Sequence, residues 1–167
     1  ERVSRLVLVG SYGLQDKSPY HHLSYFMVRM PWLMNSMWAL ARGSRMAAEY
    51  SLKNIIFNPR SRTPDQVEEV LQAMQNLESQ KAFGQWQRDE IQWKGVKTNY
   101  TSRLSEIRIP VLIVNGTNDI GVPLKYASRA DGILPNYRLE VIEGAGHWTQ
   151  RDYPQLFNRL LLEFLSE

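Results

Sequence analysis

Three short apolar runs constrain the fold of this 167-residue chain more than any other feature. The first two occupy residues 6–9 and 111–114, contain only aliphatic side chains and are followed closely by glycine. Strands without polar alternation are typical of a parallel sheet that is covered on both faces. A third run at residues 139–142, apolar except for Glu140, also precedes a glycine. We therefore predict an α/β fold with a mostly parallel sheet.

Two helices are expected to pack on this sheet. Residues 123–134 follow the second strand, and Pro123 suits a first helical position. Strand, helix and strand at this spacing form a right-handed crossover. Pro154 begins a final amphipathic helix, whose apolar face carries Leu156, Phe157, Leu160, Leu161 and Phe164.

The middle of the chain has a different pattern, without a convincing strand. Helices are expected at four places, residues 31–41, 44–53, 64–74 and 81–93, the last interrupted near Gly84. Thr63 followed by Pro64 is a helix N-terminus signal. We predict a core formed by residues 1–13 and 105–167, with residues 14–104 inserted as an all-helical cap.

Composition narrows the classes of function. The chain has no cysteine, which excludes disulfides and thiolate metal sites and is compatible with a cytoplasmic location. Its 20 basic residues are scattered, so the net charge of +3 does not indicate a nucleic-acid partner. The most apolar stretch, residues 26–40, is interrupted by Arg29 and Asn35, and we expect no membrane span. His21 and His22 are expected in a loop, not as metal ligands.

Two polar residues follow neighbouring strands of the predicted sheet. Asp119 lies just past the second strand, in "NGTNDIGVP", and His147 lies just past the third, in "EGAGHW". Ligands of parallel α/β sheets bind at the carboxyl ends of the strands, where these two loops would meet. A carboxylate can hold an imidazole in one tautomer, and the imidazole can then act as a general base. Either residue alone is typical of a turn or of packing, but together they predict a catalytic pair.

Longer stretches resemble a known superfamily. "IRIPVLIVNGTNDIGVP" and "LEVIEGAGHWTQRDYPQLFNRLLLEFL" resemble the C-terminal part of an α/β-hydrolase. The opening "ERVSRLVLVGSYGL" resembles the sixth strand of that fold, after which members carry a helical cap. The resemblance implies the C-terminal part of a doubly wound, mostly parallel sheet, with Asp119 as the acid, His147 as the base and no cofactor. "GHW" followed by "FNRLLLEFL" is similar to carbon–carbon-bond hydrolases, and "GHWTQ" is equally similar to epoxide hydrolases.

The nucleophile of such a triad is expected outside this chain. In this superfamily it precedes the acid, on a G-x-S-x-G turn between a strand and a helix. The one candidate, Ser11 in "VGSYG", has Val9 at the first glycine position and is followed by a loop-like segment. We therefore interpret the chain, which begins at Glu1 and not at Met, as the C-terminal half of a longer hydrolase. An uncovered first strand would recruit the missing N-terminal half or a second copy.

The predicted cap is rich in aromatic and methionine side chains. They either form the core of the cap or roof a pocket for a small apolar substrate, which methionine would suit. Trp148, directly after the base, either positions His147 or faces the substrate. Candidate substrate-binding residues are Trp148, Trp32 and Trp38, and Tyr20, Tyr25 and Tyr50 are candidates for activating an epoxide ring.

Three functions remain open from the sequence. The first is a cofactor-independent hydrolase that attacks an ester, or another small apolar carbonyl compound, through a serine acyl-enzyme. The second is an epoxide hydrolase or dehalogenase with an aspartate nucleophile. The third is a non-catalytic α/β-hydrolase-like binding protein, although binding alone does not need the Asp–His pair.

Overall fold

The computed structural model describes residues 2–167, which divide into two compact units. The first unit comprises the chain up to Gln15, together with Asn54–Ser61 and Asn99–Glu167. The second unit comprises Asp16–Lys53 and Arg62–Thr98. Residues 54–61 group with the first unit, although the sequence pattern placed them inside one continuous insertion. The chain therefore passes from one unit to the other in the middle of the predicted cap.

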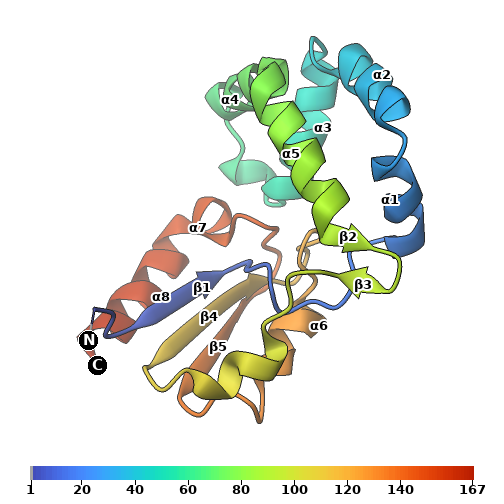
Figure 1. Cartoon of the computed structure of the whole chain (residues 1–167). Helices are drawn as coiled ribbons and strands as arrows, with labels where there is room; N and C mark the ends of the chain where they lie inside the picture. Colours follow the sequence, from blue (N-terminus) through green and yellow to red (C-terminus); the bar gives the residue numbers. More distant parts are fainter. Residues whose placement is uncertain (1) are drawn as a thin grey trace. The chain divides into compact units, whose positions relative to one another are not determined.

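The first unit contains a three-stranded parallel sheet (Figure 1). Its strands are β1 (Leu6–Val9), β4 (Val111–Gly116) and β5 (Tyr137–Ile142), in the order β1-β4-β5. All six residues of the central strand β4 are buried. The parallel sheet that the apolar runs predict is therefore confirmed.

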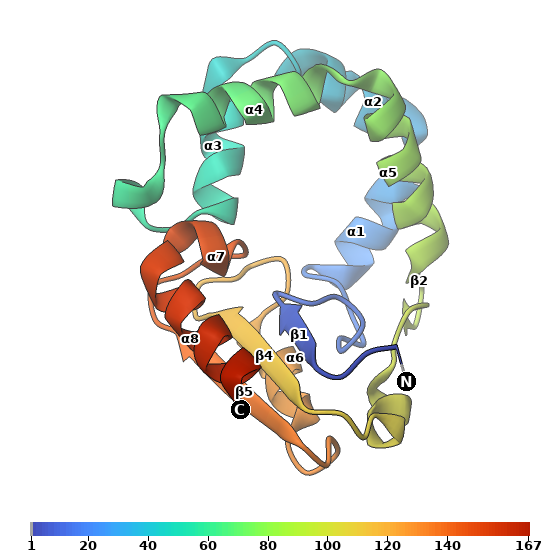
Figure 2. The ribbon, with the colours of Figure 1, turned by 90° about the vertical axis from the view of Figure 1, so that its left-hand side faces the viewer.

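Helices cover both faces of this sheet (Figure 2). One face packs against α6 (Leu124–Ala127) and the short 3₁₀ helix η3 (Ser128–Ala130). The other packs against α8 (Pro154–Ser166), which follows the single turn of α7 (Thr149–Asp152). Side chains alternate between the faces of a strand, so the apolar residues 111–114 of β4 contribute to both cores.

The crossover helix is shorter than the sequence pattern predicted. Pro123 has an extended ψ of 138° and precedes α6 instead of beginning it. The helical segment ends at Asp131, whose ψ of 131° is also extended, and Gly132 then adopts a left-handed φ of +71°. A turn residue and a glycine at the end of a short helix explain the earlier termination.

The second unit is mostly helical. Its elements are α1 (His21–Val28), α2 (Pro31–Ala41), α3 (Arg45–Ile55, ending in the first unit), α4 (Pro64–Gln75), α5 (Leu77–Glu90) and a hairpin of β2 (Ile91–Gln92) and β3 (Gly95–Val96). Two further 3₁₀ helices, η1 (Pro59–Ser61) and η2 (Thr101–Glu106), belong to the first unit.

Three local expectations for this region were wrong. Helix α1 begins at His21, where a loop was expected, because an apolar stretch follows directly. Helix α5 continues through Gly84, since a single glycine costs only about 1 kcal/mol in a helix interior. The β2–β3 hairpin has two residues in each strand, too few to produce a recognisable alternation.

The start of α4 agrees with its sequence signal. The Thr63 side chain accepts a hydrogen bond from the backbone N–H of Gln66 at 3.3 Å, and the Gln66 side chain accepts one from the N–H of Thr63 at 2.9 Å. This reciprocal capping box satisfies two backbone donors at the helix N-terminus.

A bilayer-spanning helix is not found among residues 2–167, since none there combines the necessary length and apolarity.

Candidate active site

The carboxyl end of β4 leads into a turn that fixes Asp119. Its Oδ1 accepts hydrogen bonds from the backbone N–H groups of Gly121 at 2.9 Å and Val122 at 2.8 Å. The side chain has no exposed surface. Two backbone donors on one oxygen hold the carboxylate in a single orientation, with Oδ2 left for another partner.

That partner is His147, in the loop after β5. Its Nδ1 lies 2.9 Å from Asp119 Oδ2, and 36% of its side chain is exposed. Because an ionised carboxylate can only accept, the imidazole donates from Nδ1 and keeps the lone pair of Nε2 for another proton. The hydrogen bond to Asp119 raises the pKa of His147 above its ordinary value of 6.5, and the negative charge of Asp119 adds to this against the opposing effect of burial. Sequence reasoning predicted this pair, and the structure brings the two residues together.

The end of β1 also touches the pair. Gly10 has a left-handed φ of +49°. A Cβ atom at this position would lie 3.1 Å from His147 Nδ1 and 3.2 Å from Asp119 Oδ2. The backbone of the edge strand therefore packs directly against the Asp119–His147 contact, with no space for a side chain. The sequence analysis interpreted Gly10 only as the end of a strand. A glycine at that position was the one available sign that the backbone there approaches other groups closely.

A second buried carboxylate supports the loop after β5 that contains His147, which we call the histidine loop. Asp152, only 1% exposed at the end of α7, accepts hydrogen bonds from the backbone N–H groups of Gly146, Phe57 and Asn58. The N–H of Trp148 donates to the carbonyl of Ile55 at 3.0 Å. Sequence analysis missed Asp152, because nothing in the local pattern indicates that residues 54–61 lie against this loop.

The remaining candidates of the first unit are arranged differently. Ser11 follows Gly10 in a loop that continues to α1, not in a strand–turn–helix elbow, and no hydrogen bond joins it to His147 within the described chain. Trp148 is half-buried, and its ring lies under the guanidinium of Arg151 at 4.9 Å. Its backbone bond to Ile55 ties the loop, so Trp148 contributes to the local structure on either interpretation of its ring.

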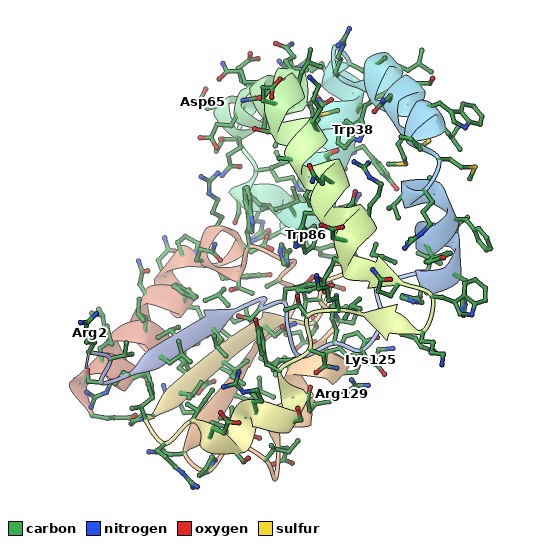
Figure 3. The ribbon with its side chains drawn as sticks, in the orientation of Figure 1. Arg2, Trp38, Asp65, Trp86, Lys125 and Arg129 are labelled. Atoms are coloured by element: carbon green, nitrogen blue, oxygen red, sulfur yellow. The ribbon has the colours of Figure 1, made fainter. Side chains whose placement is uncertain are left out.

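The two candidate tryptophans of the second unit lie on α2. Trp38 (Figure 3) lines a cavity of about 400 Å³ together with Met34 and side chains of α5. Trp32 is 68% exposed. These positions do not test a role in substrate binding, which stays a prediction.

His21 has protein partners at both ring nitrogens. Its Nε2 lies 2.8 Å from the carbonyl oxygen of Gln92, and its Nδ1 lies 3.2 Å from Ser18 Oγ. These contacts connect the start of α1 to the β2–β3 hairpin within the second unit. Nowhere along residues 2–167 do His, Asp and Glu side chains cluster as a metal site would require.

Known hydrolases resemble this chain in sequence and in structure. A 2-hydroxy-6-oxononadienedioate/2-hydroxy-6-oxononatrienedioate hydrolase of Pseudomonas putida is 45% identical over 68 residues, which is 41% of this chain and 24% of that protein. A meta-cleavage product hydrolase of Pseudomonas fluorescens has a similar structure, with a TM-score of 0.72 and 23% sequence identity. The match covers 99% of this chain and 57% of the Pseudomonas fluorescens chain. A carboxylesterase of Bacillus subtilis gives a TM-score of 0.64 at 20% identity, over 99% of this chain and 52% of its own.

These comparisons also show how much of such proteins the chain represents. It spans little more than half the length of the two solved structures and aligns with a quarter of the Pseudomonas putida protein. The family model described as alpha/beta hydrolase fold matches residues 1–154. The parallel sheet, the aspartate after β4 and the histidine after β5 agree with that match, and the chain belongs to the α/β-hydrolase fold family.

Proposed function

We propose that this chain supplies the acid and the base of a hydrolase that cleaves a small carbonyl compound. The observation that carries the proposal is the contact between His147 Nδ1 and the fully buried carboxylate of Asp119. A half-exposed imidazole that is fixed in this way has Nε2 available as a general base, while Asp119 stabilises the imidazolium that forms.

The proposed reaction is acyl transfer through a serine. Nε2 of His147 takes the proton of the serine hydroxyl as its oxygen attacks the substrate carbonyl, and then gives that proton to the leaving group. Water hydrolyses the acyl-enzyme by the same route, with His147 as base again. An ester releases an alcohol in the first step, and a carbon–carbon substrate releases a protonated carbon fragment.

The serine is proposed to lie outside residues 1–167. The chain order of a hydrolase of this fold is nucleophile, acid, histidine, and Ser11 stands on a loop and not on an elbow. Strand β1 pairs only with β4 in the described part of the chain, so its other edge is available to a further strand. We propose that the nucleophile-bearing part of the same protein covers that edge.

The names of the relatives favour one substrate class within this chemistry. The Pseudomonas putida relative is named for a 2-hydroxy-6-oxo dienoic diacid. We propose that the whole protein hydrolyses a carbon–carbon bond next to a ketone of this kind, with simple esters as slower substrates.

Replacing His147 by alanine in the full-length protein tests the proposal. Hydrolysis of a 2-hydroxy-6-oxo dienoate and of p-nitrophenyl esters is expected to fall by on the order of 10⁴-fold in kcat, as when a member of a catalytic triad is removed. His22→Ala is the matched control, because His22 is exposed and contacts the ring of Trp93 within the second unit, whereas His147 belongs to the first.

Unchanged turnover in His147→Ala would exclude both a serine and an aspartate nucleophile mechanism. If turnover is lost with an epoxide or a haloalkane, and the carbonyl substrates are never hydrolysed, the aspartate-nucleophile alternative replaces the proposal.

A further inference from the structure

Asp152 is a buried ionisable residue that the proposed reaction does not use. It is 1% exposed, and both of its carboxylate oxygens accept hydrogen bonds from the backbone. Oδ1 accepts from the N–H of Asn58 at 2.7 Å, and Oδ2 accepts from the N–H groups of Phe57 at 3.0 Å and Gly146 at 2.5 Å. Three backbone N–H groups therefore converge on one carboxyl group, and hydrogen bonds from N–H groups to a carboxylate are among the strong ones.

These bonds join two segments that are far apart in the sequence. One is the histidine loop, and the other is residues 54–61, which we call the strap because it connects α3 to α4 through the first unit. The backbone of Asp152 also contacts the strap, since its carbonyl oxygen accepts from Ser61 Oγ at 2.6 Å and from Asn58 Nδ2 at 3.3 Å.

Asp152 and the strap together hold the residue on each side of His147. Gly146, on one side, donates to Asp152, and Trp148, on the other, donates to the carbonyl of Ile55 at 3.0 Å. The approach at Gly146 is close, because a Cβ there would lie 2.8 Å from the carbonyl oxygen of Ile55. The backbone position of His147 is therefore defined by the strap, not only by the end of β5.

We propose that Asp152 is a positioning residue that holds His147 against Asp119 by fixing the strap to the histidine loop. Its functional importance rests on the proposed role of His147 as the base. An aspartate is required because three N–H groups converge on its two oxygens. An asparagine would turn an NH₂ group toward at least one of those donors and leave it unsatisfied.

The test is a pH titration of His147 in the full-length protein, monitored by NMR with ¹⁵N-labelled histidine. The His147 signal is assigned by its absence from the spectrum of His147→Ala. Asp152→Asn is expected to lower the pKa of His147 and to weaken the downfield signal of the Nδ1 proton, because the imidazole no longer reaches Asp119. The change should have the same direction as in Asp119→Asn, and kcat should fall while KM stays close to that of the wild type.

Two control variants separate positioning from a loss of stability. Ser61→Ala removes the bond to the carbonyl of Asp152 but leaves the three carboxylate bonds, and Phe164→Leu reduces the core under α8, away from the loop. Both are expected to leave the titration of His147 unchanged, even where they lower the free energy of unfolding.

If Asp152→Asn does not fold, Asp152→Glu gives the same information. It keeps the charge but displaces the carboxylate by one methylene, so the pKa of His147 should fall by less. A wild-type titration in whichever of these two variants folds would overturn the proposal. The titration needs no turnover, so it would remain informative if the proposed hydrolase activity were not found.

Discussion

At the scale of single residues, Asp119 divides its two oxygens between two functions. Oδ1 is bound to the backbone at Gly121 and Val122, and Oδ2 is bound to the imidazole. Rotation of the carboxylate would break both sets of bonds at once. The orientation of His147 is therefore fixed by the turn after β4 as well as by its own loop, which is the preorganisation that a general base needs.

Asp119→Asn should change the pH dependence of the reaction. The pKa of His147 is raised mainly by its hydrogen bond to Asp119, so the variant should bring that pKa down. A base must be neutral, and the rising limb of kcat/KM against pH should lie above pH 6.5 in the wild type and move to lower pH in the variant, with a much smaller maximum. Asp131→Asn, at an exposed carboxylate bound to Tyr137, should leave the profile in place.

The raised pKa of His147 also makes the stability of the fold depend on pH. The contribution of His147 to stability decreases as the pH rises, whereas the expected activity increases. Because the folded-state pKa is raised, protonated His147 stabilises the fold, fully so below its unfolded value of 6.5. This contribution is lost as the pH rises through the folded-state pKa. The pair is therefore most stabilising at a pH where the proposed base is protonated and inactive.

Gly10→Ala should damage the site without removing any polar group. A Cβ would be 2.9 Å from the carbonyl oxygen of His147, and alanine disfavours a φ of +49°. We expect a loss of about 1–3 kcal/mol in the free energy of unfolding, measured in urea, together with a lower kcat. Gly43→Ala is the control, because its Cβ would meet no atom within 4 Å and its φ is not positive. Full activity in Gly10→Ala would contradict the packing described here.

At the scale of elements, the sequence predicted what depends on local pattern. Strand β4 could be recognised because every one of its residues is buried, and the start of α4 because Thr63 and Pro64 form a cap signal. The pairing of Asp119 with His147 followed from strand topology, since both stand after neighbouring parallel strands.

Long-range contacts could not be predicted in this way. Asp152 and the strap are about ninety residues apart in the sequence, and their hydrogen bonds involve backbone donors that carry no sequence signal. Gly10 was visible as a glycine, but its neighbours come from two distant loops. The early end of α6 and the β2–β3 hairpin were missed because elements of two to four residues have no measurable period.

The capping box of α4 gives a prediction at this scale. Thr63→Ala removes the acceptor of the Gln66 N–H, so the free energy of unfolding should fall by about 1 kcal/mol in a urea titration. Ser36→Ala is the matched control: its hydroxyl donates to the carbonyl of Trp32 in the exposed interior of α2, and the change should stay within about 0.5 kcal/mol. Equal losses in the two variants would show that the box contributes nothing specific.

At the scale of the whole molecule, the open edge of β1 determines how the chain behaves alone. Leu6 N–H bonds to the carbonyl of Pro110, just before β4, and Gly10 N–H bonds to that of Val114, so by alternation the N–H groups of Val7 and Val9 point to the other edge. Unpaired strand edges recruit further strands. Large apolar side chains are also exposed, among them Leu23, Trp32, Leu40 and Met46.

The purified 167-residue chain is therefore expected to self-associate. Light scattering after size exclusion should give a mass above 19.4 kDa. Val7→Pro removes a donor from the open edge and should reduce the association, whereas Leu8→Pro, on the side facing β4, should unfold the sheet instead. A wild-type chain that elutes as a soluble monomer would contradict this expectation.

The path of the backbone between the two units limits how the helical unit can be exchanged with that of a relative. The chain crosses between them four times, because residues 54–61 leave the helical unit and return to it. A helical unit inserted at one point could be exchanged with that of a relative as a single cassette with two junctions. Here an exchange of residues 16–98 would also replace the strap. A folded chimera should therefore keep the native residues 54–61 and receive the two flanking segments separately, so the helical unit would be exchanged less easily than its place in the sequence suggests.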